Sequence, residues 1–357
     1  MSQKKFIPFH EVVDQESIIV DGLHTQGLIL SHWKGGNIHP SITDDTSGGI
    51  VLNAIEQNFE GINNPLISAT HFDIDGFVGV WALFEPELAM VYKSVMHKMA
   101  VIGDFRELNL QNPGADHALK LVCYINAVEK DQFYIPFGEV EEIKLCVEKF
   151  EYFIPQFKEV LLNTDQFKSI WETEYHHAIS DYKRIDSGEY PVNNYPEIGL
   201  QCIHAKAPMH YYGLFSKSDG YDIVMSIYPN NRYEVECKYT SWVDITSRPT
   251  LPRISFKPLL TQLNILEKSG FTWHADGVAD TGPILRLEKD QLSKAERYAN
   301  PTEREIYPST IDTYIFERLV TDFFKFAYHT ISPKKFWTWK EIRLSLIHIS
   351  EPTRQEA

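Results

Sequence analysis

The segment HFDIDG at residues 71–76 lies between a short apolar run and a helical apolar pattern. The apolar run at 66–70 is typical of a buried strand, and the apolar positions at 77–84 recur with helical spacing. The segment is therefore predicted to fall where a strand ends and a helix begins. In open α/β sheets this junction is where ligands bind.

Three potential metal ligands alternate within this segment, namely His71, Asp73 and Asp75. Alternate residues of an extended chain place their side chains on the same side. Imidazole nitrogens and carboxylate oxygens are both ligands of divalent metals. Two carboxylates held close together repel each other unless a cation lies between them. The pattern therefore predicts that these residues bind a divalent metal ion.

The segment allows two other interpretations. Asp73 or Asp75 could be the N-cap of the following helix, with Gly76 letting that helix pack closely on the strand. A cap accounts for one aspartate but not for all the ligands together. A calcium loop of the EF-hand type needs a bidentate Glu at its twelfth position. Because Ala82 stands there, this interpretation is excluded.

The wider pattern predicts the fold class. Strand and helix patterns alternate over 17–135, which favours an α/β fold with a mostly parallel sheet and flanking helices. Helical spacing follows at 139–185, and alternation at 197–247 predicts an antiparallel meander. Its expected strands are 198–204, 211–215, 221–228 and 233–245, followed by a helix at 256–268, a strand at 284–287 and a helix at 308–330.

These patterns divide the chain into successive parts. We predict an α/β domain at 1–135 and a helical linker at 136–192. A smaller α+β domain with an antiparallel sheet and a C-terminal helix is predicted at 193–343.

Further polar residues fall at the predicted strand ends of the first domain. Asp21 and His32 follow the first two strands, and Asp45 and Ser47 open the next helix. The carboxyl ends of adjacent parallel strands share one edge of the sheet, so we expect these residues to meet the HFDIDG segment there. Asp21 and Asp45 would be further metal ligands, and His32 a catalytic residue. Ser47 would belong to a helix start that binds phosphate.

Each of these candidates also has a structural interpretation. Asp21 could belong to a turn with the glycine that follows it. Asp45, or Asp44 before it, could be a routine helix cap. His32 could be a core histidine. Asp104, at the end of a later apolar run, is a second catalytic candidate with the same structural alternative.

The second domain has two arginines in a proline-stiffened loop, Arg248 and Arg253. Arginines in such a loop suit bidentate capture of a phosphate or carboxylate, so we expect them to bind substrate. His274, in a polar cluster before a glycine turn, is a further substrate-binding candidate. Surface arginines without a ligand are the alternative.

The composition limits the partners. The chain has 357 residues, a formal net charge of −15 and a pI near 5.4. This acidity argues against extended nucleic acid and anionic membranes, but not against a small phosphorylated substrate, because a bound metal inverts the local charge. The sequence contains no apolar run of membrane-spanning length and no apolar signal segment, and its 4 cysteines form no close pair. We therefore expect a cytoplasmic protein with reduced thiols.

The last residues are set apart from the functional argument. Residues 344–354 (LSLIHISEPTR) resemble a translated sequencing-library adapter read in frame. We expect the gene-derived sequence to end near Arg343 and treat 344–357 as an adapter-derived tail.

The pattern His71-x-Asp73-x-Asp75-Gly76 resembles the first motif of the DHH phosphoesterase superfamily, including the strand before it and the helix after it. The resemblance implies two bound divalent ions, usually Mn²⁺ with Mg²⁺ as the alternative, and hydrolysis of phosphate esters or anhydrides. It implies that His71 and Asp73 hold one ion and Asp75 the other.

The match to this superfamily is partial. No Asp-His-His triplet follows the motif, and the nearest likenesses lie upstream at Asp21 and His32. In the second domain, Arg248, the helix at 256–268 and His274 follow the order of the superfamily's substrate domain. The chain also resembles an uncharacterised bacterial domain-of-unknown-function family over most of 15–290, which brings no activity.

Two functions follow as hypotheses. The first is a divalent-metal-dependent phosphoesterase acting on a small phosphorylated or nucleotide-like substrate. In it, Asp21 or Asp104 completes the ligand set and His32 orients the phosphate or acts as general acid. The second, motivated by the missing triplet, is a non-catalytic ligand- or nucleotide-binding protein on a degenerate phosphoesterase-like scaffold.

Overall fold

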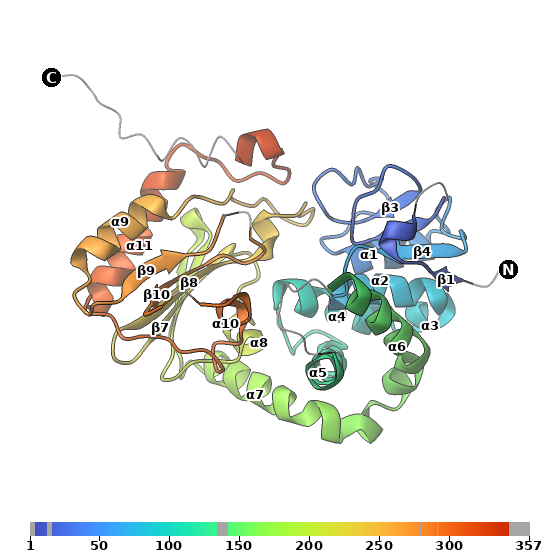
Figure 1. The fold of residues 1–357 in the computed structure, drawn as a ribbon, viewed down its shortest axis with the longest axis horizontal. Helices are drawn as coiled ribbons and strands as arrows, with labels where there is room; N and C mark the ends of the chain where they lie inside the picture. The colour runs from blue at the N-terminus through green and yellow to red at the C-terminus, as the bar shows by residue number, and fades with distance from the viewer. Residues whose placement is uncertain (1–3, 13–15, 134–141, 279, 291, 343–357) are drawn as a thin grey trace. The chain divides into compact units, whose positions relative to one another are not determined.

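The computed structural model describes residues 4–12, 16–133, 142–278, 280–290 and 292–342. The chain divides into two units, Met1–Ile179 and Ser180–Ala357 (Figure 1). Within the described ranges, every helix is too short or too polar to span a lipid bilayer. The adapter-like tail at 344–357 lies outside the described residues.

The first unit contains a four-stranded sheet whose order is β1-β4-β2-β3 and whose strands are all parallel. The strands are β1 (Lys5–Phe6), β2 (Ile18–Val20), β3 (Leu28–Leu30) and β4 (Leu66–Ala69). Every residue of β2 is buried, as expected for a central parallel strand covered on both faces. The parallel sheet with flanking helices agrees with the α/β prediction.

Helices α1 (Ser47–Glu56) and α2 (Ile74–Phe84) pack on one face of this sheet (Figure 1). The unit also contains α3 (Pro86–Val91), α4 (Lys93–Phe105), α5 (Ala115–Gln132) and α6 (Glu142–Leu162), with short 3-10 helices η1 (Phe9–Glu11) and η2 (Thr164–Phe167). A Cβ at Gly79 would lie 2.7 Å from Val20 Cγ1 and 3.5 Å from Gly48 Cα. Helix α2 therefore packs closely on both β2 and α1. On the other face, Ile19 packs with Ile7.

The expected linker is divided between the units. Helix α6 belongs to the first unit, and α7 (Lys168–Asp186) contains the boundary at Ile179. Residues 136–141 of that linker lie outside the described residues.

The second unit contains a six-stranded mixed sheet in the order β5-β6-β7-β8-β10-β9. The strands are β5 (Val192–Tyr195), β6 (Leu200–His204), β7 (Ile223–Tyr228), β8 (Arg232–Cys237), β9 (Thr272–Ala275) and β10 (Ile284–Glu288). The helices are α8 (Tyr211–Leu214), α9 (Lys257–Leu266), α10 (Lys294–Tyr298) and α11 (Thr313–Tyr328), with 3-10 helices η3 (Pro196–Ile198) and η4 (Tyr239–Ser241). Helices α9 and α11 share a hydrophobic core with one face of the sheet (Figure 1).

The prediction of a purely antiparallel sheet is corrected by one pair of strands. Strands β6 and β7 are parallel, whereas the other neighbouring pairs are antiparallel. The segment predicted as a strand at 211–215 forms helix α8 instead, because the His210 side chain accepts a hydrogen bond from the Tyr212 N–H and caps that turn. A crossover between β6 and β7, in place of a hairpin, leaves the two strands running in the same direction.

Candidate metal centre

Polar side chains converge at the carboxyl edge of the parallel sheet in the first unit. Asp21 directly follows β2, and His32 lies shortly after β3. His71 and Asp73 follow β4, and Asp75 lies in the first turn of α2. Because β4, β2 and β3 are parallel neighbours, their ends bring these residues to one place.

Asp21 belongs to two groups of potential metal ligands at once. The first group is Asp21, His32 and Asp75, and the second is Asp21, His71 and Asp73. Within each group the ligand atoms lie within 4.8 Å of one another. Asp21 Oδ1 is 3.5 Å from His32 Nε2, and Asp21 Oδ2 is 3.4 Å from His71 Nε2. The carboxylate therefore turns one oxygen toward each group, as a carboxylate bridging two ions does.

The two groups differ in their access to solvent. The side chains of His32 and Asp75 are each 1% exposed, so we call their group the inner group. The side chains of His71 and Asp73 are 40% and 36% exposed, so we call theirs the outer group. A ligand arriving from solvent meets the outer group first.

Asp21 is held at both its side chain and its backbone. Ser47 Oγ donates a 2.7 Å hydrogen bond to its Oδ1, and Thr70 Oγ1 donates one of 2.7 Å to its backbone carbonyl. Its φ of 48° lies in the left-handed region, which Asp tolerates better than most residues. Backbone strain of this kind is concentrated at functional sites.

The start of helix α1 binds the Asp75 carboxylate. The backbone N–H of Ser47 donates to Asp75 Oδ2 at 2.8 Å, and that of Gly48 donates to Oδ1 at 2.7 Å. The next N–H, of Gly49, is capped by Thr46 Oγ1 at 3.0 Å. The donors that the sequence suggested for a substrate phosphate are thus used inside the protein, and Ser47 supports the acidic cluster.

Asp73 is both a helix cap and a member of a group of potential metal ligands. Its Oδ1 accepts a 2.7 Å hydrogen bond from the Gly76 N–H and caps helix α2. Its Oδ2 lies 3.0 Å from His71 Nε2 in the outer group. The neighbouring Phe72 packs between Phe150 and Phe153 of α6, with ring centroids 5.0 and 5.3 Å away. Anchoring Phe72 in the core directs His71 and Asp73 to the opposite side.

Both histidines turn Nε2 toward the acids. Nδ1 of His32 lies 2.6 Å from the Asp45 carbonyl, so Nδ1 carries the proton that donates to it. Nδ1 of His71 lies 3.0 Å from Thr70 Oγ1. Metal-binding histidines are typically oriented in this way, with the non-ligating nitrogen hydrogen-bonded to an oxygen.

Asp104, near the end of α4, approaches the inner group from another element. Its Oδ2 lies 3.8 Å from His32 Nε2. Among the described residues, this buried oxygen has no hydrogen-bond partner. A buried carboxylate oxygen without a donor is costly unless a cation neutralises it.

Burial and crowding shift the acidity of the cluster. Burial, and next the neighbouring carboxylates, raise the pKa of Asp75 and of Asp104 well above the usual range, and the pKa of Asp21 is raised by burial and then by Asp73. Burial lowers the pKa of His71 because it disfavours the charged imidazole. The nearby carboxylates of Asp73 and then Asp21 have the larger, opposite effect and raise this pKa to about 10.

The charges show that the cluster fits a divalent ion. Two imidazoles, of His32 and His71, face four carboxylates, those of Asp21, Asp73, Asp75 and Asp104. Even with both imidazoles protonated, the fully ionised cluster keeps a negative charge in a buried place. Oxygen ligands with a minority of imidazole nitrogens suit a hard or borderline divalent ion.

Asp45 contributes through its backbone. Its carbonyl oxygen accepts the hydrogen bond from His32, and its side chain is in neither ligand group. The neighbouring Asp44 accepts hydrogen bonds from Thr46 and from His97 instead.

The arginines of the second unit have structural partners. Arg253 is 2% exposed, and its guanidinium donates to the carbonyls of Lys238, Val278, Asp280 and Thr281. Arg248 forms a 2.7 Å ion pair with Asp222. We expected the two guanidinium groups to bind a substrate. In the structure they donate hydrogen bonds to oxygen atoms of the protein itself. His274 is exposed on β9.

Comparison with known proteins places the chain in a family. The sequence matches the Family of unknown function (DUF6687) over residues 2–335. The chain belongs to this family. The DUF6687 match includes every member of the inner and outer groups and confirms the expected domain-of-unknown-function family. No curated protein and no solved structure matches significantly. The likeness to the DHH superfamily stays a prediction.

Proposed function

We propose that the protein is a divalent-metal-dependent phosphoesterase acting on a small phosphorylated or nucleotide-like substrate. The observation that carries the proposal is the position of Asp21, whose two carboxylate oxygens face the inner and outer groups separately. Sites that hold two divalent ions are typical of phosphatases and nucleases. The resemblance of residues 71–76 to a phosphoesterase motif supports the same reaction class.

The residues that would hold the ions are those of the two groups. Asp21, His32 and Asp75 would hold the inner ion, with Asp104 beside them, and Asp21, His71 and Asp73 the outer one. The imidazoles favour Mn²⁺ over Mg²⁺, which prefers oxygen ligands and water. Bound ions of this kind polarise a phosphate and lower the pKa of a bound water.

The protein contributes orientation and access. Asp75 is held by the start of α1, and His32 by the Asp45 carbonyl, so neither has to reorganise when substrate binds. The substrate would approach the exposed side chains of His71 and Asp73. Because the side chain of His32 is 1% exposed, the proposal gives it the role of a metal ligand and not that of a general acid that touches substrate.

Metal analysis and an activity screen test the proposal. The full chain would be stripped with EDTA, reloaded with Mn²⁺ and assayed on phosphomonoesters, dinucleotides and pyrophosphate. We expect about two ions per chain, and about one in Asp73→Asn together with loss of activity. Asp131→Asn, at an exposed position of α5, is the matched control. Absence of bound metal in wild type, with Asp73→Asn behaving as wild type, would overturn the proposal.

Metal binding is expected to depend strongly on pH. Because the pKa values of Asp75 and Asp104 are raised and that of His71 is raised to about 10, bound protons must leave when an ion binds. Affinity should therefore continue to rise with pH above about 5, where ordinary carboxylates are already ionised. Calorimetric titrations in two buffers of different ionisation enthalpy measure the released protons. A pH-independent affinity above about 5 contradicts the assignment.

The missing Asp-His-His triplet motivates the binding-protein alternative. Because Asp75 and Thr46 accept from the first N–H groups of α1, a nucleotide phosphate would have to bind to other groups of the protein. A non-catalytic nucleotide-binding protein predicts a thermal shift with nucleotides that survives EDTA. If EDTA abolishes every such shift, this alternative fails.

A further inference from the structure

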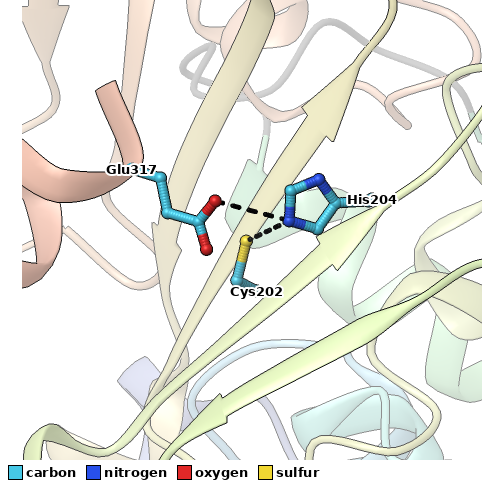
Figure 2. Close-up of side chains that lie close together, drawn as sticks. All are labelled: Cys202, His204 and Glu317. Carbon is cyan, nitrogen blue, oxygen red and sulfur yellow. Dashed lines mark hydrogen bonds and ion pairs between the residues drawn. The ribbon is translucent and has the colours of Figure 1, made fainter. Parts of the chain in front are cut away.

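A second cluster of metal-ligating side chains lies in the second unit, on the face of the sheet covered by α11. Cys202 and His204 are alternate residues of β6, so their side chains point to the same face of the sheet. Glu317 reaches them from α11 (Figure 2). The cluster thus joins a thiol, an imidazole and a carboxylate from two elements far apart in the sequence.

The three ligand atoms converge on one point. Cys202 Sγ lies 3.6 Å from His204 Nε2, and Glu317 Oε2 lies 3.5 Å from the same nitrogen. All three lie within 4.8 Å of one another. With bonds of about 2.3 Å to sulfur and about 2.0–2.2 Å to nitrogen and oxygen, a tetrahedral zinc site places N and S about 3.6 Å apart and N and O about 3.4 Å apart. The observed N–S and N–O separations, 3.6 and 3.5 Å, are close to these values.

The same geometry argues against a nucleophilic triad. In such a triad the carboxylate binds the ring nitrogen that does not face the nucleophile, so that it orients the base. In this cluster Glu317 and Cys202 both contact Nε2 of His204 (Figure 2). A shared cation requires all three ligand atoms to lie close to one another, as they do within 4.8 Å in this cluster.

Neighbouring residues hold the carboxylate in place. Tyr195 donates a 2.8 Å hydrogen bond from its hydroxyl to Glu317 Oε1, which leaves Oε2 directed at His204. Asn193 Nδ2 lies 3.3 Å from Glu317 Oε1 and 3.3 Å from His204 Nε2. A metal ion bound to Nε2 would replace the contact between Asn193 and His204 and leave the contact between Asn193 and Glu317. Orienting partners of this kind are typical of metal ligands.

The cluster is open to solvent at His204 and Glu317. Cys202 is fully buried, whereas the side chains of His204 and Glu317 are 30% and 17% exposed. Three protein ligands with a partly exposed side leave a fourth position for water. A thiolate and a carboxylate together balance the charge of a divalent ion.

We propose that Cys202, His204 and Glu317 form a zinc site that is independent of the acidic cluster of the first unit. When the ion binds, the thiol proton of Cys202 passes to solvent and a sulfur–metal bond replaces the S–H bond. Thiolate ligands select Zn²⁺, whereas a carboxylate-rich cluster suits Mn²⁺ or Mg²⁺. The two units would therefore bind different metals.

Cobalt substitution tests the site directly. Co²⁺ added to the reduced, metal-free full chain should give a thiolate-to-metal charge-transfer band in the near ultraviolet, with about one ion per chain responsible. The band should disappear in Cys202→Ser and weaken strongly in His204→Ala and Glu317→Gln. Cys237→Ser, which changes another buried cysteine of the same sheet, is the matched control and should keep it.

Further variants keep the result interpretable. If Cys202→Ser does not fold, His204→Ala changes a partly exposed residue and still removes a ligand. Asp73→Asn should leave the band unchanged, which separates this site from the phosphoesterase proposal. Absence of a thiolate band in wild type, or its persistence in both Cys202→Ser and His204→Ala, would overturn the zinc site.

Discussion

The Asp21→Asn variant is expected to lose both metal ions together. Asp21 alone belongs to the inner and outer groups, with Oδ1 3.5 Å from His32 Nε2 and Oδ2 3.4 Å from His71 Nε2. The asparagine amide offers one neutral oxygen and an NH₂ group, whose hydrogens repel a cation. We expect metal content to fall from about two ions to less than one, and activity to fall at least about 100-fold.

Paired variants separate this bridging role from a general loss of charge. Metal content is measured by elemental analysis after dialysis, and activity on the best substrate of the screen. Asp75→Asn and Asp73→Asn should each remove about one ion. Asp45→Asn keeps the backbone carbonyl that binds His32 and should retain both ions. Equal metal content in Asp21→Asn and Asp45→Asn would show that Asp21 does not bridge.

The position of the site at the edge of the sheet could be predicted from the sequence, because short sequence patterns mark where the strands end. The change from an apolar run to helical spacing around residues 71–76 marks the junction of β4 and α2, and the polarity of parallel strands then brings Asp21 and His32 to the same edge. In the structure Asp21 lies 3.5 Å from His32 and 3.4 Å from His71 at that edge.

Side-chain direction in irregular segments could not be read in the same way. Asp45 precedes the Thr46 cap of α1, and only the folded loop decides that its backbone carbonyl meets His32. The position of Arg253 in a proline-stiffened loop predicted that it binds a phosphate or carboxylate of the substrate. It is instead buried against carbonyls of segments that pack together only in the folded unit.

Long-range contacts were the least predictable. The spacing of Cys202 and His204 in a strand is a weak signal on its own, and Glu317 lies on a helix much later in the chain. Likewise, the aromatic-rich segment that forms α8 has the alternation of a strand, and the His210 cap decides for the helix. Helix α8 lies in the connection between β6 and β7, which are parallel.

The Glu267→Gln variant is expected to lose about 2 kcal/mol of unfolding free energy near neutral pH, because solvent screening weakens the contribution of the charge. Glu267 follows α9, and Ser309 and Thr310 donate to it at 2.5 and 2.8 Å. Trp273 Nε1 adds a 3.1 Å hydrogen bond. Burial raises the pKa of Glu267, but these hydrogen bonds outweigh it and lower the pKa from 4.5 to about 2. A neutral amide cannot accept the same set of donors.

The pH dependence fixes the sign of this effect. Because the folded pKa is depressed, the stabilisation is complete above the unfolded pKa of 4.5 and is lost as pH falls through the folded value of about 2. Denaturant unfolding of wild type and Glu267→Gln should therefore differ most near pH 7 and less near pH 3. Glu305→Gln, at an exposed position of the same unit, should match wild type at both pH values. A Glu267→Gln deficit that is the same at both pH values would assign the loss to packing and not to the charged hydrogen bonds.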